Sequence, residues 1–475
     1  MSKWTILIIV FFISCSGTPE FTQAKNDQPY PLELSKYGAL SVLAIDVSTG
    51  DVIIERHSQQ RMTPASLTKI FTTGAGIASL PSNYRYKTRF YINKGVDSKT
   101  RLVIVGGGDP TLGSNRFNET KPENIFKEVA DALLMLEGIH TIDGGIVIDN
   151  SCYSGTQLPS KRLWEDVGNY YGATPNALSY KENTFRLSLK SPAGVGKPCT
   201  IIKTIPKLNI EFDCRVKSAA NRKDSAYIYG TPAMDKWYVS GTIPQGRSNF
   251  TIKGALPHPE ATFANELRDF LRLEGIQMGS DLEYQSLSQL EGTNRVVYTH
   301  HSPSINKVTS VINKRSHNLY ADHLLFSLGQ ETYGKSDWDN GVKALTGFWR
   351  SKVPGFSGLF FDGCGLSPFN AVSASDMVEA LVWMNQSEHK EVFKKTLSVA
   401  GVDGTLRGIL KDDGFKGKVI GKSGSMNGVL GYCGYIKTQD GKELAFCIMA
   451  NRYTESFKEL RANMESLMKA LIVQN

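Results

Sequence analysis

The sequence predicts a multidomain protein of the α+β class, built around an α/β domain with an antiparallel sheet that carries inserted β-rich subdomains. Alternating apolar residues predict a hairpin at 41–54, near the start of the chain, and three consecutive strands between 419 and 451, near its end. A stretch of different character, roughly 96–296, lies between them and is rich in short strands. We therefore expect the two ends to form one domain and the middle to be inserted into it.

The N-terminal hairpin leads into a helix. Ser48-Thr49-Gly50-Asp51 supplies the turn between the two strand segments. Pro64 stands just before the helix, where its fixed φ and missing N–H are tolerated. Apolar residues then recur at helical spacing: Leu67, Ile70, Phe71, Gly74 and Ile77. This pattern predicts a buried helix whose N-terminus presents Ser66.

Five short strands and two helices make up the inserted stretch. The predicted strands are 101–105, 145–148, 184–189, 200–205 and 249–253. The helices, near 123–137 and 260–274, both end in Leu-Glu-Gly-Ile, with the glycine placed for a left-handed cap before a strand. The shared ending indicates either an internal duplication of an αβ unit or a chance similarity of helix ends.

The C-terminal strands are predicted at 419–426, 429–436 and 444–451. A closing helix follows, with these residues on one face: Phe457, Leu460, Met464, Leu467 and Leu471. If Asp440-Gly441 is a two-residue turn, Cys433 faces Ile448, and the sulfurs of Cys433 and Cys447 point to opposite faces. Among the seven cysteines, Cys199 and Cys214 in a short loop-rich stretch are the better candidate pair.

Composition is that of an ordinary globular protein. The 475 residues are 41% hydrophobic and 21% charged, enough for two or three domains. The net charge of +8 suits an anionic envelope polymer or membrane surface, but lysine and arginine are scattered, so we expect no nucleic-acid binding. No cluster of histidine, cysteine and aspartate has metal-ligand spacing, so neither a metal nor another cofactor is expected. Composition makes no prediction of the oligomeric state.

Residues 1–24 have the pattern of a secretory signal. One positive charge precedes an apolar run, 5–14, that is too short to span a bilayer comfortably. Cleavage is expected either after Ala24, a small-residue site, or before Cys15, where Phe12-Ile13-Ser14-Cys15 approximates a lipoprotein box. The mature protein is therefore predicted to be extracytoplasmic, periplasmic or envelope-associated, with a lipid anchor if cleavage precedes Cys15.

Ser66 and Lys69 form a Ser-x-x-Lys pattern at the predicted helix start. Positions i and i+3 share a face of a helix, so the unprotonated Lys69 amine can take the proton of the Ser66 hydroxyl. The helix N-terminus also favours a developing oxyanion. The same pattern recurs at Ser304, Ser387 and Ser466, so by itself it does not identify a nucleophile.

Two further motifs follow, Ser316-His317-Asn318 and Lys422-Ser423-Gly424, in the order required by serine acyl-transfer enzymes that bind penicillin. The first interval, from Ser66 to Ser316, spans 250 positions, whereas the second spans 106. A single cleft does not need so long a first interval. The spacing therefore supports an insertion between the first two motifs.

With these motifs the chain resembles the penicillin-binding D-alanyl-D-alanine carboxypeptidases and endopeptidases of the penicillin-binding protein 4 type. The resemblance covers nearly the whole mature chain and is carried by 64–69, 106–110, 169–173, 316–321, 362–367 and 401–406. It implies a penicillin-binding transpeptidase-like (serine β-lactamase-like) domain and two insertions. The implied domains are 25–95 with 297–475, a second of 96–189 with 241–296, and a small third of 190–240 nested in the second.

The resemblance implies that Ser66 forms an acyl-enzyme with a peptidoglycan stem peptide, and that Lys69 acts as its base. For this the pKa of Lys69 must fall well below its ordinary value, through burial and the nearby cation Lys422. Ser316 would relay a proton to the leaving amine, and Asn318 would hold the substrate amide and Lys69.

The third motif is implied to bind the substrate's end. Lys422 and Ser423 would bind the terminal carboxylate, and Gly424 would let the substrate backbone lie against the strand. The backbone N–H groups of Ser66 and Ser425 would form the oxyanion hole. β-Lactam antibiotics would act as covalent inhibitors.

Some positions depart from the family pattern. His317 stands where the family usually has aspartate, Ser423 where threonine is commoner, and Cys364 where serine is common. Pro368 replaces an arginine that could bind an acidic stem-peptide side chain. We expect His317 to face away from Ser316, its neighbour in sequence.

Asp149 has two interpretations. The matching family position suggests that it contacts the amino group of the substrate's diamino acid, and the alternative is an aspartate that caps a turn after a strand. Gly106 to Pro110 is glycine-rich, but no Gly-Lys-Ser/Thr follows, and Pro110 and Gly113 indicate a turn rather than a phosphate loop.

The sequence thus predicts a serine-type D-alanyl-D-alanine carboxypeptidase, and a D,D-endopeptidase as well. Two alternatives are a serine β-lactamase-like hydrolase and a catalytically weak penicillin-binding sensor. The large insertion argues for a polymer substrate, and no residue marks a dedicated deacylating glutamate. All polar side chains of the three motifs are present, which argues against a sensor.

Overall fold

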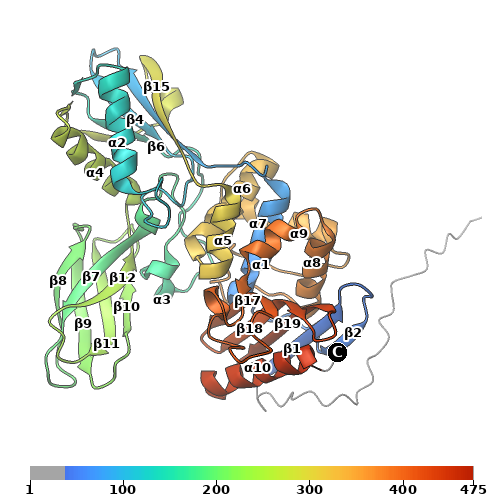
Figure 1. Cartoon of the computed structure of the whole chain (residues 1–475). Helices are drawn as coiled ribbons and strands as arrows, with labels where there is room; N and C mark the ends of the chain where they lie inside the picture. Colours follow the sequence, from blue (N-terminus) through green and yellow to red (C-terminus); the bar gives the residue numbers. More distant parts are fainter. Residues whose placement is uncertain (1–37, 474–475) are drawn as a thin grey trace, which may run out of the picture.

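The computed structural model describes residues 38–473, which include every motif discussed above from Ser66 onward. Figure 1 shows three parts: one rich in helices with a sheet below them, one with two helices beside a sheet, and one made of strands. The signal-peptide and lipid-anchor predictions concern residues 1–24 and lie outside the described residues. No helix among the described residues is long and apolar enough to cross a membrane.

The two ends of the chain form one six-stranded antiparallel sheet, as predicted. Its order is β16-β17-β18-β19-β1-β2, so the first strand among the described residues pairs with the last. The strands are β1 (Ala39–Asp46), β2 (Val52–Arg56), β16 (Ser398–Val399), β17 (Val419–Met426), β18 (Val429–Lys437) and β19 (Glu443–Asn451). The predicted hairpin and the three C-terminal strands are confirmed to within two residues.

The connection between β18 and β19 differs from the predicted two-residue turn. The N–H of Thr438 donates to the carbonyl of Lys442 at 3.0 Å, and residues 438–442 form the loop. This shifts the register by one residue and places Cys433 directly opposite Cys447. The predicted pairing of Cys433 with Ile448 is therefore wrong, because loop length sets hairpin register. Both thiols are buried and free.

Helices cover both faces of this sheet. They are α1 (Thr68–Ser79), α5 (Ile305–Arg315), α6 (Asn318–Tyr333), α7 (Trp338–Lys352), α8 (Ala374–Gln386), α9 (Lys390–Thr396) and α10 (Phe457–Val473). Leu40 and Val42 of β1 pack in the core beneath α10, whereas Leu43 and Ile45 pack in the core with α1, α7 and α8. This alternation is expected of a strand buried on both faces. Of the residues predicted on the apolar face of α10, Phe457 is the one left exposed.

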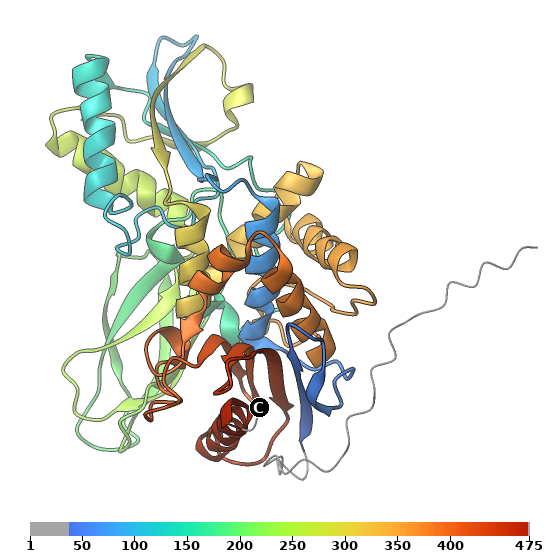
Figure 2. The same cartoon turned by 45° about the vertical axis from the view of Figure 1, so that its right-hand side comes forward.

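Helix α1 lies among the other helices of this part, as Figure 2 shows in blue. Phe71 meets Trp349 and Phe356 edge to face, each at 5.5 Å between ring centroids. Such pairs each stabilise by about 0.5–1.5 kcal/mol beyond their buried area. The N-terminal end of α1, which carries Lys69, is thereby held rigidly.

The second part contains a five-stranded sheet of order β14-β6-β4-β3-β15. Its elements are β3 (Lys87–Lys94), β4 (Thr100–Val105), β6 (Ile146–Asp149), β14 (Leu282–Tyr284), β15 (Thr293–His301), α2 (Pro122–Asp131) with a π-helical turn (Ala132–Leu136), α4 (Pro259–Leu273), β5 (Thr141–Ile142) and β13 (Gln277–Met278). Gly138 and Gly275 have φ of +61° and +90°, which confirms the two left-handed caps. The strands that follow them pair in parallel, β5 with β13 and β6 with β14, so the two αβ units lie side by side.

The third part is made of two three-stranded sheets, β12-β7-β8 and β10-β11-β9. Its elements are α3 (Trp164–Val167), β7 (Thr184–Lys190), β8 (Thr200–Ile205), β9 (Glu211–Ala219), β10 (Ser225–Tyr229), β11 (Lys236–Pro244) and β12 (Phe250–Ala255). Phe185, Trp237 and Ile252 share its core. Cys199 and Cys214, the candidate disulfide pair, are neighbours here as free thiols, with Cys214 Sγ 3.6 Å from the Cys199 carbonyl oxygen.

Strand pairing shifts the expected domain boundaries. Strand β3 was placed with the catalytic segments, yet it pairs with β4 and β15 in the second sheet. The small third domain is expected at 190–240, but β7 and β12 share one sheet and one core with it, which extends the strands of this unit to about 184–256, with α3 beside them. Membership of a sheet depends on partners far away in the sequence, and composition alone does not reveal them.

Candidate active site

Ser66 lies in a 3-10 turn (Ala65–Leu67) that runs directly into α1. Ala65 has φ of +48°, an uncommon backbone conformation for a residue with a side chain. Gly365, with φ of +82°, packs against this turn, and a Cβ there would lie 1.9 Å from the Ala65 carbonyl oxygen. Only glycine therefore allows the loop that contains residue 365 to approach the turn that presents Ser66.

Lys69 lies one helical turn after Ser66 and is completely buried. Its Nζ is 3.0 Å from Ser66 Oγ. It also donates to two oxygens that can only accept: Asn318 Oδ1 at 2.7 Å and the Cys364 carbonyl at 2.5 Å. The amine is thus held at three points, one of which is the hydroxyl of Ser66.

The electrostatic surroundings of Lys69 oppose one another. Burial lowers the pKa of Lys69, as predicted, and the Arg162 guanidinium acts in the same direction. Cys364 and the carboxylates of Asp322 and Asp362 act to raise it. No motif in the sequence connects Arg162 with this lysine. The net result is a pKa below the ordinary value of a lysine.

Ser316 and Asn318 occupy the junction of α5 and α6. Ser316 ends α5 in a left-handed conformation, φ +54°, and Asn318 begins α6. Lys422 of β17 donates to Ser316 Oγ at 2.9 Å and to the carbonyl of Ser423 at 2.5 Å. Burial and the neighbouring Lys69 lower the pKa of Lys422 well below its usual value. The three motifs therefore meet around two buried lysines.

Gly424 packs tightly against the turn that presents Ser66. A Cβ at this position would lie 2.6 Å from the Pro64 carbonyl oxygen and 3.0 Å from the Leu67 nitrogen, both backbone atoms of the Ser66 turn. The missing side chain therefore makes room for the backbone of this turn. Ser423 is half-buried and Ser425 exposed on the same strand.

The three other Ser-x-x-Lys patterns do not form such a pair. Lys307 is exposed and lies 3.8 Å from Glu119, and Ser387 donates to the Met384 carbonyl at the end of α8. Lys469 on α10 pairs with Asp412 at the surface. Only the pattern at Ser66 brings a buried amine to the serine hydroxyl.

The chain also matches known proteins. The profile of the D-Ala-D-Ala carboxypeptidase 3 (S13) family matches residues 33–471. The chain belongs to this family. It is 26% identical over 434 residues to a D-alanyl-D-alanine carboxypeptidase of Actinomadura sp. (strain R39), covering 88% of this chain and 78% of that one. It is 23% identical over 475 residues to D-alanyl-D-alanine carboxypeptidase DacB of Haemophilus influenzae, and this match covers 97% of this chain and 95% of that one.

Solved structures agree on the fold. The crystal structure of penicillin binding protein 4 (dacB) from Haemophilus influenzae superposes with a TM-score of 0.76 at 22% identity, over 92% of this chain and 96% of that one. A second structure of that protein, complexed with a β-lactam, gives 0.73 over the same shares. The penicillin-binding protein 4 resemblance and its multidomain transpeptidase-like fold are therefore confirmed, and the protein is a serine D-Ala-D-Ala carboxypeptidase of the S13 family.

In this S13 carboxypeptidase, His317 points toward the inserted parts. Its Nε2 lies 3.1 Å from Glu182 Oε2, and its ring lies against Tyr320 at a tilt of 39°, with 4.1 Å between centroids. Burial lowers the pKa of His317, although Glu182 opposes this. These contacts hold His317 to Glu182 rather than to the Ser66 hydroxyl.

Asp149 makes none of its hydrogen bonds to the Ser66 cluster, which consists of Ser66, Lys69, Ser316, Asn318 and Lys422. Its Oδ1 accepts from the Ser151 N–H and its Oδ2 from the Leu287 N–H, both at 2.8 Å. These are the contacts of the turn-capping alternative, one to each carboxylate oxygen. The glycine-rich segment before Asp109 also ends in a turn, where Asp109 Oδ1 accepts from Thr111.

Several residues around Lys69, on the side away from Ser66, were not predicted from the sequence as part of the site. Asp322, Asp362 and Cys364 bring ligand-type atoms within 4.8 Å of one another, a grouping that could suggest a metal site. Arg162 Nη2 contacts all three, at 3.0, 3.3 and 3.4 Å, so a guanidinium is the cation of this cluster. The segment 362–367 was noted for its resemblance, whereas no motif in the sequence indicated Arg162.

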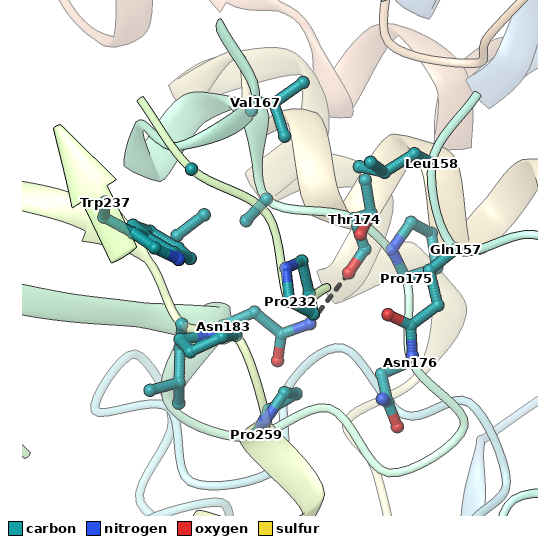
Figure 3. A pocket seen from close by; sticks show the side chains of 16 residues that line it. Gln157, Leu158, Val167, Thr174, Pro175, Asn176, Asn183, Pro232, Trp237 and Pro259 are labelled. Carbon is teal, nitrogen blue, oxygen red and sulfur yellow. Dashed lines mark hydrogen bonds between the residues drawn. The ribbon is translucent and has the colours of Figure 1, made fainter. Parts of the chain in front are cut away.

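A small cavity of about 20 Å³ lies apart from this site, between the inserted parts (Figure 3). Trp237, Pro259 and Asn183 line it, and Asn183 Nδ2 donates to the Thr174 carbonyl at 2.9 Å. The volume is close to that needed for one water molecule. None of its lining residues belongs to the Ser66 cluster.

Proposed function

We propose that this carboxypeptidase removes the terminal D-alanine of peptidoglycan stem peptides through an acyl-enzyme on Ser66. The observation that carries the proposal is the environment of Lys69. A neutral amine has two N–H groups and one lone pair, and two carbonyl oxygens, of Asn318 and Cys364, take both N–H groups. The lone pair is then left for the third neighbour, the Ser66 hydroxyl at 3.0 Å.

The proposed reaction has two halves. Ser66 Oγ attacks the carbonyl carbon of the penultimate residue, and its proton passes to Lys69 Nζ. The tetrahedral intermediate collapses, the C–N bond breaks, and the leaving amine takes a proton relayed through Ser316. Water then attacks the ester and releases Ser66. The 2.9 Å contact between Lys422 and Ser316 orients the relay hydroxyl for this step.

Strand β17 is proposed to bind the end of the substrate. Lys422 and Ser423 would recognise the terminal carboxylate, and the N–H groups of Ser66 and Ser425 would stabilise the oxyanion. Strand β16 pairs only with Ile420 and Gly421, so no described strand pairs with the outer edge of β17 beyond that point. An extended peptide could add to this edge by backbone hydrogen bonds.

The open edge also supports D,D-endopeptidase activity. Cleavage of a D-alanyl cross-link uses the same acylation step and differs only in its larger leaving group. An edge that no described strand covers would take a long leaving peptide by the same backbone hydrogen bonds as one amino acid. Asp149, whose two oxygens accept backbone N–H groups of its own turn region and of Leu287, is left out of this proposal as a recognition residue.

We further propose that β-lactams acylate Ser66 and that the enzyme works outside the cytoplasm. The first follows from the shared acylation chemistry and from the β-lactam complex of the Haemophilus influenzae relative. The second follows from the apolar N-terminal pattern and from the location of peptidoglycan in the cell envelope.

Labelling with a fluorescent penicillin tests the nucleophile. We expect one label per chain, mapped by peptide mass to Ser66, and none on Ser66→Ala. An adduct on Ser304, Ser387 or Ser466 would overturn the assignment. Digestion of purified peptidoglycan sacculi tests the substrate: loss of D-alanine measures carboxypeptidase, and conversion of cross-linked dimers to monomers measures endopeptidase. Rapid hydrolysis of penicillin without D-alanine release would instead favour a β-lactamase, and stable labelling without either product a sensor.

A further inference from the structure

Arg162 carries a guanidinium from the inserted part of the chain into the back of the active site. Its side chain is 1% exposed, and those of its partners Asp322 and Asp362 are 0% exposed. Nη1 donates to the Gly172 carbonyl at 3.2 Å, which ties the arginine to its own segment. A charge so completely removed from water persists only where opposite charge and hydrogen bonds offset the loss of solvation.

The two carboxylates that Arg162 contacts also shape the loop behind Lys69. Asp322 Oδ1 accepts from the Gly363 N–H at 3.0 Å. Asp362 Oδ1 accepts from the Gly365 N–H at 2.8 Å. The residue between these two glycines is Cys364, whose carbonyl oxygen receives the 2.5 Å hydrogen bond from Lys69. Arg162, Asp322 and Asp362 are therefore connected to Lys69 by hydrogen bonds through the loop at Cys364.

Several titratable groups from separate elements surround Lys69. They are Asp322 on α6, Asp362 and the neutral thiol of Cys364 in the loop after α7, Arg162 in the inserted segment, Lys422 on β17 and His317 at the start of α6. The two carboxylates favour the protonated ammonium form of Lys69, and Arg162 opposes them. Burial acts on the same side as Arg162. Removing the guanidinium would leave the carboxylates facing Lys69 as their nearest remaining cation.

We propose that Arg162 is a positioning residue for the base: it offsets Asp322 and Asp362 and so lowers the pH at which Lys69 becomes a free amine. The inference rests on the proposed role of Lys69 as the base that takes the Ser66 proton. Arg162 itself touches neither Ser66 nor a substrate. It acts through the charge it offsets and through the loop that holds the Cys364 carbonyl against Lys69.

The test is the pH dependence of acylation by a fluorescent penicillin. The acid limb is the low-pH part of the profile, where the acylation rate rises as Lys69 loses its proton. For Arg162→Met we expect this limb to shift to higher pH by about one unit, so that the rate at a given pH on the limb falls about tenfold. Raising the pH above the limb should restore the rate to within about twofold of wild type. A merely structural role would lower the rate equally at every pH, and that result would overturn the proposal.

Two further variants keep the test decisive. Asp322→Asn with Arg162 intact removes one opposing charge, so its acid limb should move to lower pH even if Arg162→Met fails to fold. The double variant Arg162→Met/Asp322→Asn should return the limb toward wild type. An unmoved limb in Asp322→Asn, or a double variant no closer to wild type than Arg162→Met, would refute the offsetting role.

Arg350→Met is the matched control, because Arg350 is an exposed arginine on α7 and loses the same charge. Its profile should coincide with that of wild type. Lys69→Met separates the two levels of inference. If Lys69→Met acylates normally, the proposed base is wrong. If it is inactive while Arg162→Met has an unshifted profile, the base stands and the role of Arg162 falls.

Discussion

Replacement of Lys422 by methionine separates two roles that are proposed for this residue. The ammonium group could bind the substrate carboxylate, or it could serve proton transfer through Ser316, to which it donates at 2.9 Å. Methionine keeps most of the buried stem and removes only the nitrogen and its hydrogen bonds. Activity lost in Lys422→Met therefore reports on the nitrogen rather than on a cavity in the core.

The size of the effect follows from the contact that is lost. Lys422 is fully buried, and burial and Lys69 lower its pKa, so a substrate carboxylate beside Nζ must draw a proton onto it. A charge-assisted hydrogen bond of this kind contributes about 1.5–3 kcal/mol. Its loss should slow acylation about 10- to 150-fold.

The assay uses two peptides that differ only at the C-terminus, one ending in free D-alanine and the other in D-alaninamide. We expect wild type to prefer the free carboxylate and Lys422→Met to lose most of that preference, because the amide never made the charged contact. Lys411→Met, which alters an exposed lysine, should preserve it. Equal losses on both peptides would refute the carboxylate role and leave Lys422 as a partner of Ser316.

Two further results are expected. Gly424→Ala would place a Cβ 2.6 Å from the Pro64 carbonyl oxygen. We therefore expect the acylation rate, measured by penicillin labelling, to fall at least tenfold, and the free energy of unfolding, measured in urea, to fall by about 1–3 kcal/mol. Wild-type values of both quantities would contradict the tight contact. Burial raises the pKa of Asp109 to about 6 and lowers that of His300 to about 4. Between pH 7 and 5 the folded protein therefore takes up a proton on Asp109, which increases the free energy of unfolding. Over the same interval the unfolded chain takes up a proton on His300, which decreases it. On acidification from pH 7 to 5, the free energy of unfolding of His300→Gln should therefore rise by about 1–2 kcal/mol relative to that of wild type, as measured by urea unfolding. If the two proteins change by the same amount between these pH values, the expected contribution of His300 is refuted.

Much of the site was predictable because its chemistry depends on short local spacing. Lys69 lies three positions after Ser66 on one helical turn, and in a Ser-x-Asn motif at a helix junction the serine and asparagine side chains must lie close to each other. The C-terminal strands were predictable for a similar reason, since alternation along β17 to β19 is read within each strand.

The missed features depend on contacts between distant segments or on the length of a loop. Arg162 reaches Asp322 and Asp362, which lie 160 and 200 positions away in the chain. The register that places Cys433 opposite Cys447 depends on a five-residue loop where a two-residue turn was assumed. Neither a buried ion pair nor a loop length leaves a periodic signal in the sequence.

These distant contacts change how the insertion should be understood. Arg162 offsets the two carboxylates behind Lys69. The carbonyl of Tyr171 accepts from Asn318 Nδ2 at 2.8 Å, which turns the amide oxygen of Asn318 toward Lys69. An insertion that only recruited substrate could be lost or exchanged without harm to the chemistry. This one supplies a buried charge and a fixed acceptor to the wall of the active site, so its segment from 162 to 171 is bound to the catalytic residues by the same geometry that orients the base.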